Sequence, residues 1–175
     1  MEIRTERLTL RPLEYSDWPF VLHLGKDFES GPGPSRNYDG MHAVSEDEAR
    51  EQTRLYMETG MFWTVLCRGF PVGEVNFYPE GDSYELGYCF LTLAQGKGYA
   101  RESCRALLSY YEANGVTRFT AGTALDNKPS VRLLENLGFR LTGTERLWMR
   151  TDEEGREIWF DGGQFELVAS PGDPE

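Results

Sequence analysis

The stretch AQGKGYARE at residues 94–102 stands between an apolar segment, SYELGYCFLTL at 83–93, and an amphipathic one, SCRALLSYYEANG at 103–115. The apolar segment is typical of a buried strand, and the amphipathic one spaces its apolar residues along one helix face. A helix N-terminus exposes unpaired N–H groups and binds anions, and glycines let a phosphate approach the backbone. A glycine turn that only ends the strand is the alternative. We predict a pyrophosphate-binding turn made by Gln95, Gly96, Lys97, Gly98, Tyr99 and Ala100.

Length and composition predict one globular domain. The chain has 175 residues, which is enough for a single domain with a real core, here placed at 1–169 with a disordered tail at 170–175. The sequence has no long apolar run, and its start is charged, so we expect a cytoplasmic protein without membrane contact. The net charge of −11 disfavours a nucleic-acid partner and mildly favours a cationic one, such as an amine.

Three scattered cysteines and only two histidines predict neither a disulfide framework nor a metal site. The rest of the chain alternates between strand and helix signals. Ser45 and Glu48 form a capping box before a helix that stops at Gly60, and a Gly/Pro-rich loop spans 28–40. Strands are predicted at 3–11, 61–67, 70–79, 83–93, 116–123, 139–150 and 157–169. Helices are predicted from Ser16, from Ser45, after the glycine turn as far as Asn114, and from Asn127. This order indicates an α/β (α+β) fold, a mixed sheet of about seven strands flanked by about four helices.

Several blocks of the sequence resemble one superfamily. QGKGYA matches the Q/R-x-x-G-x-G/A signature of the GNAT acyl-CoA-dependent N-acyltransferases at Gln95, Gly98 and Ala100. ELGYCFLTLAQGKGYARE, NKPSVRLLENLGF and TERLTLRP resemble blocks of its branch that contains the RimJ- and RimL-type ribosomal-protein N-terminal acetyltransferases. The predicted order of elements is also similar to that of the superfamily fold, so the resemblance covers nearly the whole chain.

The resemblance implies a site for acetyl-CoA. The strands at 83–93 and 116–123 would splay apart in a V-shaped opening that holds the cofactor. The turn at 95–100 would hold the pyrophosphate, and Asn127 would contact the pantetheine arm or its thioester end, with helix capping as its alternative or additional role. The pantetheine arm would pair like an added strand with the backbone of Phe90, Leu91, Thr92 and Leu93.

Attack of an amine on a thioester requires a neutral amine, a polarised carbonyl and a proton donor for the thiolate. Glu85 is the candidate base, because it lies on the strand lining the implied opening and resembles the glutamate that is the base in several superfamily members. An exposed or ion-paired strand carboxylate is the alternative. Glu74 is the reserve candidate. It lies on the neighbouring strand, on the same face as Asn76.

The proton donor departs from the usual superfamily pattern. The tyrosine that many members carry corresponds to Leu134, and Met149 stands where the Rim-type branch places a glutamate base. Ser130 lies three residues after Asn127, on the same helical face, and fits the serine used near the thiol in the Rim-type branch. A plain residue of the helix cap is its alternative role.

We therefore expect an acetyl-CoA-dependent N-acetyltransferase that acts by direct transfer in a ternary complex, without a metal. The alternatives for the acceptor are a protein N-terminus, a small amine such as a polyamine, and an aminoglycoside-like drug. We expect the loop at 28–41 and the closing hairpin to determine which acceptor binds. A homodimer is left open. A non-catalytic acyl-CoA sensor of the same fold is the alternative function, and a structural interaction module is a third.

Overall fold

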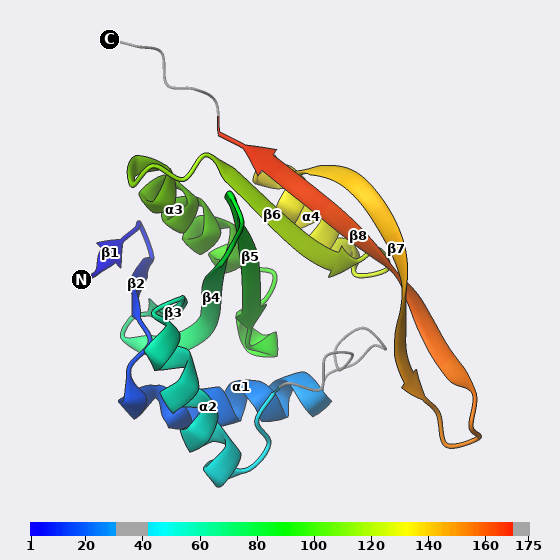
Figure 1. The fold of residues 1–175 in the computed structure, drawn as a ribbon. Coiled ribbons are helices and arrows are strands. Elements are labelled where there is room, and N and C mark those ends of the chain that lie inside the picture. The colour runs from blue at the N-terminus through cyan, green and yellow to red at the C-terminus, as the bar shows by residue number, and fades with distance from the viewer. Residues whose placement is uncertain (31–41, 170–175) are drawn as a thin grey trace. The chain divides into compact units, whose positions relative to one another are not determined.

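A computed structural model describes residues 1–30 and 42–169, so most of the predicted loop at 28–40 and the tail at 170–175 lie outside the described residues (Figure 1). The described residues form four α-helices and eight strands, which confirms the mixed α+β fold class. The elements are β1 (Ile3–Arg4), β2 (Leu8–Pro12), α1 (Trp18–Ser30), α2 (Glu46–Thr59), β3 (Phe62–Cys67), β4 (Phe70–Glu80), β5 (Ser83–Phe90), α3 (Tyr99–Ala113), β6 (Arg118–Ala124), α4 (Lys128–Asn136), β7 (Arg140–Thr151) and β8 (Glu157–Val168).

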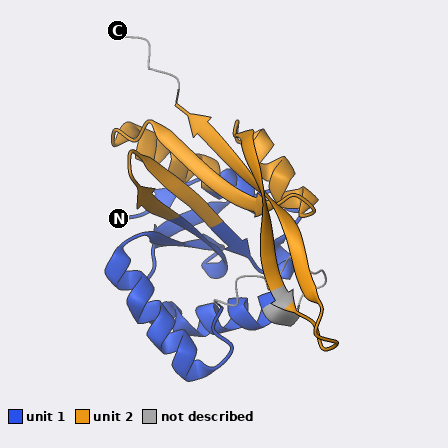
Figure 2. Ribbon diagram, turned by 45° about the vertical axis from the view of Figure 1, so that its right-hand side comes forward, with its two compact units in different colours: residues 1–76, 88–103 blue, residues 77–87, 104–175 orange. Residues whose placement is uncertain are grey.

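The chain divides into two compact units, which are interleaved along the sequence (Figure 2). The first comprises residues 1–76 and 88–103, and the second comprises residues 77–87 and 104–175. The boundaries fall inside β4, β5 and α3, so these three elements contribute to both units. Neighbouring strands follow the order β1-β2-β3-β4-β5 in the first unit and β4-β5-β6-β8-β7 in the second.

In the first unit, the predicted strand over 3–11 is wrong in one respect, because it forms two strands. Ile3 lies opposite Leu10 in the antiparallel β1–β2 pair, and the amide of Thr5 donates to the carbonyl of Leu8 at 3.0 Å. The chain therefore reverses at residues 5–7. That turn contains neither glycine nor proline, the residues that usually mark a reversal in a sequence.

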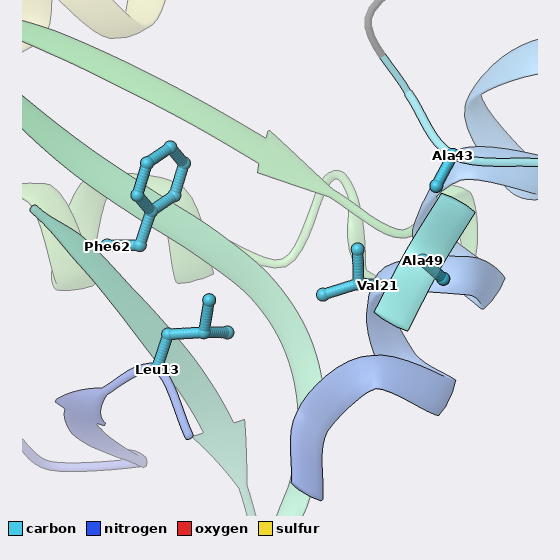
Figure 3. Packing of buried hydrophobic residues seen from close by; sticks show 5 residues of the cluster. All are labelled: Leu13, Val21, Ala43, Ala49 and Phe62. Carbon is cyan, nitrogen blue, oxygen red and sulfur yellow. The ribbon is translucent and has the colours of Figure 1, made fainter. Parts of the chain in front are cut away.

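The helices of the first unit bury a small apolar cluster, which Figure 3 shows from close by: Leu13, Val21, Ala43, Ala49 and Phe62. The predicted start and end of α2 are confirmed, since the Ser45 side chain accepts from the Glu48 amide and Gly60 adopts a left-handed conformation with φ 66°. The predicted hairpin turn between β3 and β4 is also confirmed. Arg68 and Gly69 have φ values of 52° and 82°, the signs that a tight two-residue hairpin turn requires.

In the second unit, the β5–β6 pairing is short. These parallel strands pair at Tyr84 with Phe119 and at Glu85 with Thr120, and no further pair of them is found in the described residues. β6 meanwhile continues its antiparallel pairing with β8 as far as Ala124. The end of pairing after Glu85 is what a splayed strand pair requires, since the two strands are no longer hydrogen-bonded beyond that residue.

Aromatic packing forms the core of this unit on one face of these strands. The ring of Phe77 lies 4.4 Å from that of Tyr111 on α3 and 6.0 Å from that of Phe119 on β6. Tyr84 also contacts Tyr111, with ring centroids 5.5 Å apart. Because side chains alternate along a strand, Glu85 and Thr120 point to the opposite face.

Candidate active site

The predicted phosphate-binding turn connects β5 to α3. β5 ends at Phe90, three residues before the predicted end of its strand, because Thr92–Ala94 form a 3₁₀ turn. Gly96 and Gly98 then take positive φ values of 74° and 80°, and α3 begins at Tyr99. A Cβ atom added at Gly96 would meet nothing within 4 Å, and one at Gly98 would meet only the guanidinium of Arg7, at 3.3 Å. The turn therefore presents mostly bare backbone.

Consecutive amides of this turn are free to bind an anion. The backbone N–H groups from Gly96 to Arg101 have no protein acceptor within the described part of the chain, and the Glu102 amide is the first to bond backward, to the Gly98 carbonyl at 3.0 Å. Such a run of donors at a helix N-terminus is suited to phosphate oxygens. The geometry thus fits the pyrophosphate of an acyl-CoA, with the Lys97 side chain exposed beside it.

The backbone just before the turn is already bonded within the protein. The Gln95 side chain donates to the carbonyl of Phe90 at 3.0 Å, and the amide of Leu91 donates to the carbonyl of Val72 at 3.0 Å. The amide of Thr92 donates to the carboxylate of Asp27 at 2.7 Å, a partner that the sequence did not indicate. Pairing of a pantetheine arm with residues 90–93 stays a prediction, and at Thr92 it would compete with Asp27.

Each unit has a hollow lined by described residues. The one in the first unit has about 260 Å³ and adjoins the turn; its lining residues are Cys67, Val72, Leu91, Leu93, Ala94, Lys97 and Tyr99. The larger one, of about 760 Å³, belongs to the second unit, where α3, the end of α4 and the end of β8 line it. None of the predicted site residues lines this larger hollow, so size alone does not identify the site.

Glu85 lies in the second unit, where the β5–β6 pairing ends. Its residue surface is exposed, yet partial burial of the carboxyl and, second, the charge of Glu80 raise its pKa above the ordinary value. The residue opposite it is Thr120, whose buried hydroxyl has no hydrogen-bond partner among the described residues. A polar group that is buried without a partner is uncommon and is often satisfied by water or ligand, so this end of the strand pair suits a polar reactant.

Asn127 and Ser130 are brought together at the start of α4. The Asn127 side chain caps the helix by accepting from the amide of Ser130 at 3.4 Å, so its capping role is present. Both residues are half-buried. Leu134 on the same helix is fully buried, and Met149 on β7 is 7% exposed. Neither side chain has a proton to donate, and Ser130 stays the candidate that the resemblance indicates.

Glu74 is the most unusual carboxyl of the first unit. It is 7% exposed, lies on β4 opposite Thr64, and burial raises its pKa to about 7, although the charge of His42 acts in the other direction. A carboxyl that titrates near neutral pH has the property that a general base needs. The sequence marked Glu74 only as a reserve, because burial cannot be read from a strand pattern with apolar residues on both faces.

Comparisons with known proteins identify the family to which this chain belongs. A family model described as an acetyltransferase (GNAT) domain matches residues 7–140. The N-acetyltransferase YnaD of Bacillus subtilis (strain 168), itself called uncharacterized, is 27% identical over 165 residues, which cover 91% of this chain and 92% of YnaD. Human alpha/beta-tubulin-N-acetyltransferase 9 is 24% identical over 163 residues, covering 85% and 79%.

Solved structures show the same fold. A GNAT-family acetyltransferase from Bacillus anthracis has a TM-score of 0.78 and 26% identity, covering 96% of this chain and 98% of that one. RimL, a ribosomal L7/L12 alpha-N-protein acetyltransferase in complex with coenzyme A, has a TM-score of 0.79 over 97% and 98% of the two chains. At 21% identity, this second likeness concerns the fold alone.

The family match over residues 7–140 and the fold define the class of this protein as an acetyltransferase. This chain belongs to the acetyltransferase (GNAT) family, whose members use acetyl-CoA, and the predicted resemblance and enzyme class are confirmed. None of the helices in the described ranges is long and apolar enough to cross a membrane.

Substitution of Gly98 tests the anion-binding turn. Gly98→Val places a branched side chain at φ 80° and against Arg7, so it distorts the run of amides. We expect coenzyme A to bind at least about tenfold more weakly, measured by calorimetry. Gly115→Val at the other end of α3 is the control, because it imposes similar backbone strain at φ 93°. Equal affinity of the two folded variants would refute the assignment.

The raised pKa of Glu74 predicts a pH-dependent stability. The folded state binds the proton of the Glu74 carboxyl more tightly than the unfolded state does. The contribution of Glu74 to the free energy of unfolding therefore falls as the pH rises from about 4.5 to about 7, and it is constant above that pH. Glu74→Gln removes this penalty, which amounts to about 3 kcal/mol above pH 7. Denaturant unfolding between pH 4 and pH 9 measures it, with exposed Glu112→Gln as the control. Parallel curves for wild type and Glu74→Gln would mean that Glu74 is not the buried acid.

Proposed function

We propose that residues 1–169 form one N-acetyltransferase domain, which moves an acetyl group from acetyl-CoA to a primary amine in a ternary complex. The observation that carries this proposal is the run of amides from Gly96 to Arg101 at the start of α3, which have no acceptor among the described residues, in a chain of the acetyltransferase family. These amides bind the pyrophosphate of acetyl-CoA, and Lys97 adds positive charge. Asn127 contacts the pantetheine or thioester end while it caps α4.

Direct transfer needs two proton movements, which we assign to two residues. Glu85 accepts a proton from the ammonium form of the acceptor, and its raised pKa makes it a stronger base than an ordinary carboxylate. The neutral amine attacks the thioester carbonyl carbon, so a C–N bond forms and the C–S bond breaks. As the amide forms, the nitrogen loses its surplus proton, and Ser130 relays it: the Ser130 hydroxyl gives its proton to the departing thiolate of coenzyme A and takes up the proton that the nitrogen loses. Glu74 is the alternative base, supported by its burial and its pKa of about 7.

The acceptor is a protein N-terminus or a small amine. RimL, whose fold is similar, is named as an acetyltransferase of a ribosomal protein N-terminus, and one relative in sequence is named for acetylation of tubulin. The net charge of −11 attracts cationic acceptors of both kinds. An acceptor screen that follows thiol release from acetyl-CoA separates them, using peptides with a free N-terminus, polyamines and aminoglycosides.

The second candidate is a non-catalytic sensor that binds acyl-CoA. The observation in its favour is Leu134, which occupies the tyrosine position of the family motif and is fully buried, so the usual proton donor is lost. Coenzyme A binding without thiol release for any amine would support the sensor. Absence of coenzyme A binding would refute both candidates.

Glu85→Gln tests the base and the class of amine together. A lysine-type amine with a pKa of about 10.4 is nearly all protonated at neutral pH, whereas an α-amino group at about 7.7 to 8.0 is partly neutral. The substitution should therefore cost about 10² to 10⁴-fold in rate with a lysine-type acceptor or polyamine and less with an N-terminal one. The rise of the wild-type rate with pH through the pKa of the base should also disappear.

Glu80→Gln is the matched control for that experiment. Its charge raises the pKa of Glu85, so its removal should move the rising limb of the pH–rate profile to lower pH while the limb persists. If Glu85→Gln keeps the full rate and the same profile on its best acceptor, Glu85 is structural, and Glu74 or solvent accepts the proton.

Ser130→Ala tests the proton donor. If Ser130 protonates the thiolate, kcat should fall by about 10² or more, while the affinity for acetyl-CoA stays nearly unchanged. Steady-state kinetics and calorimetry separate the two quantities, and Ser109→Ala on the exposed face of α3 serves as the control. A loss of binding without a loss of kcat would make Ser130 a capping residue only.

A further inference from the structure

The start of α3 is held by residues from the turn between β1 and β2, which lie far away in the sequence. The Nη1 atom of Arg7 donates to the carbonyl of Lys97 at 2.8 Å, and its Nε atom donates to a Glu102 oxygen at 2.7 Å. The backbone amide of Arg7 donates to the other Glu102 oxygen at 2.9 Å, as does the Thr5 hydroxyl at 2.6 Å. The guanidinium also lies over the ring of Tyr99, 4.9 Å from its centroid.

The contact with Lys97 determines the direction of a neighbouring donor. The carbonyl of Lys97 and the amide of Gly98 belong to one planar, trans peptide unit, so their C=O and N–H bonds point in opposite directions. Because Arg7 holds the carbonyl, the Gly98 amide is directed away from Arg7. That amide is one of the donors without a protein acceptor in the described residues.

The contact with Glu102 removes an electrostatic conflict. A glutamate in the first turn of a helix stabilises the helix, but its charge would repel a phosphate bound at the same terminus. Both carboxylate oxygens of Glu102 are bonded to Arg7, and the Nη2 atom of Arg7 lies 2.6 Å from one of them. The negative charge is therefore compensated, and it is held on the side of the turn where Arg7 lies.

We propose that Arg7 is a positioning residue for the anion-binding turn, which orients the Gly98 amide toward a bound pyrophosphate and neutralises Glu102. This inference rests on the proposed function of the turn at 95–100 as the pyrophosphate site. Arg7 acts through the backbone and through Glu102, and the ligand itself binds to the amides. Three guanidinium nitrogens serve two partners: Nη1 contacts the Lys97 carbonyl, and Nε and Nη2 contact the Glu102 carboxylate. The single ammonium of a lysine cannot reproduce this geometry.

Calorimetry with coenzyme A tests this role in three variants. Arg7→Met should weaken binding by about 10- to 100-fold, as the loss of charge-assisted hydrogen bonds does. Arg7→Lys should bind coenzyme A nearly as weakly as Arg7→Met, because one ammonium group restores the positive charge but cannot form the hydrogen bonds of the guanidinium to both partners. Arg4→Met is the control with the same change of charge, since Arg4 pairs only with the nearby Glu2 among the described residues, and it should bind like the wild type.

A donor without the pyrophosphate distinguishes a positioning role of Arg7 from a general loss of structure in Arg7→Met. Acetyl-pantetheine lacks the pyrophosphate, so kcat/KM for this donor should be the same in the wild type and in Arg7→Met. Full recovery of coenzyme A binding in Arg7→Lys would overturn the proposal, since it would show a simple charge contact with phosphate. Unchanged binding in Arg7→Met would overturn it as well.

A ligand-free measurement distinguishes failure of this inference from failure of the proposed function. The amide resonance of Gly98 in ¹⁵N-labelled protein should shift in Arg7→Met and stay in place in Arg4→Met. If the wild type does not bind coenzyme A, the proposed function fails, while this resonance still decides whether Arg7 orients the turn. An unmoved Gly98 resonance in Arg7→Met would overturn the inference.

Discussion

The site depends on a backbone constraint at the junction of β5 and α3. Gly96 and Gly98 have positive φ values, which residues with a Cβ atom rarely adopt, and this conformation turns the chain sharply into the helix. The sharp entry leaves the amides from Gly96 to Arg101 unpaired with protein acceptors in the described residues. A single local conformation thus produces both the bare surface that a phosphate can approach and the donors that would hold it.

The proposed acetyl transfer requires this acidic protein to bind acetyl-CoA, whose phosphates are negatively charged. The net charge of −11 would repel phosphates at long range, but salt screens exposed charges beyond about 10 Å at 0.1 M ionic strength. Groups close to the ligand therefore decide binding. In the proposed site they are backbone dipoles, Lys97 and the ion pair of Arg7 and Glu102. The acidic surface elsewhere favours cationic amines, which are the acceptors that the reaction needs.

Proton transfer is where this chain departs most from the pattern of its relatives. By the resemblance, Leu134 and Met149 stand where other members carry groups with a proton to give, and both are buried in this structure. Among the described residues, the carboxyls with raised pKa values are Glu85 in the second unit and Glu74 in the first, and burial is the main cause in each case. Burial disfavours the charged form of a carboxyl, so each is a better base than a free glutamate when ionised.

Some features of this protein were determined by the sequence alone because their causes are local. The capping box of Ser45 and Glu48, the Arg68–Gly69 turn, the cap at Asn127 and the glycine turn before α3 each depend on residues a few positions apart, and all are present. The family motif at 95–100 is equally local, which is why the fold class and the family could be predicted. The assignments of Glu85 and Ser130 followed from resemblance, and they stay proposals.

Only the tertiary structure decided the features that join distant parts of the chain. The reversal between β1 and β2 has no marker in the sequence, the carboxylate of Asp27 reaches the Thr92 amide, and Arg7 reaches Glu102 across 95 positions. The burial that raises the pKa of Glu74 and the unpartnered hydroxyl of Thr120 likewise depend on what other segments place around them. Periodicity and local propensity report the conformation of a segment, whereas pairing and desolvation are properties of segments brought together by folding.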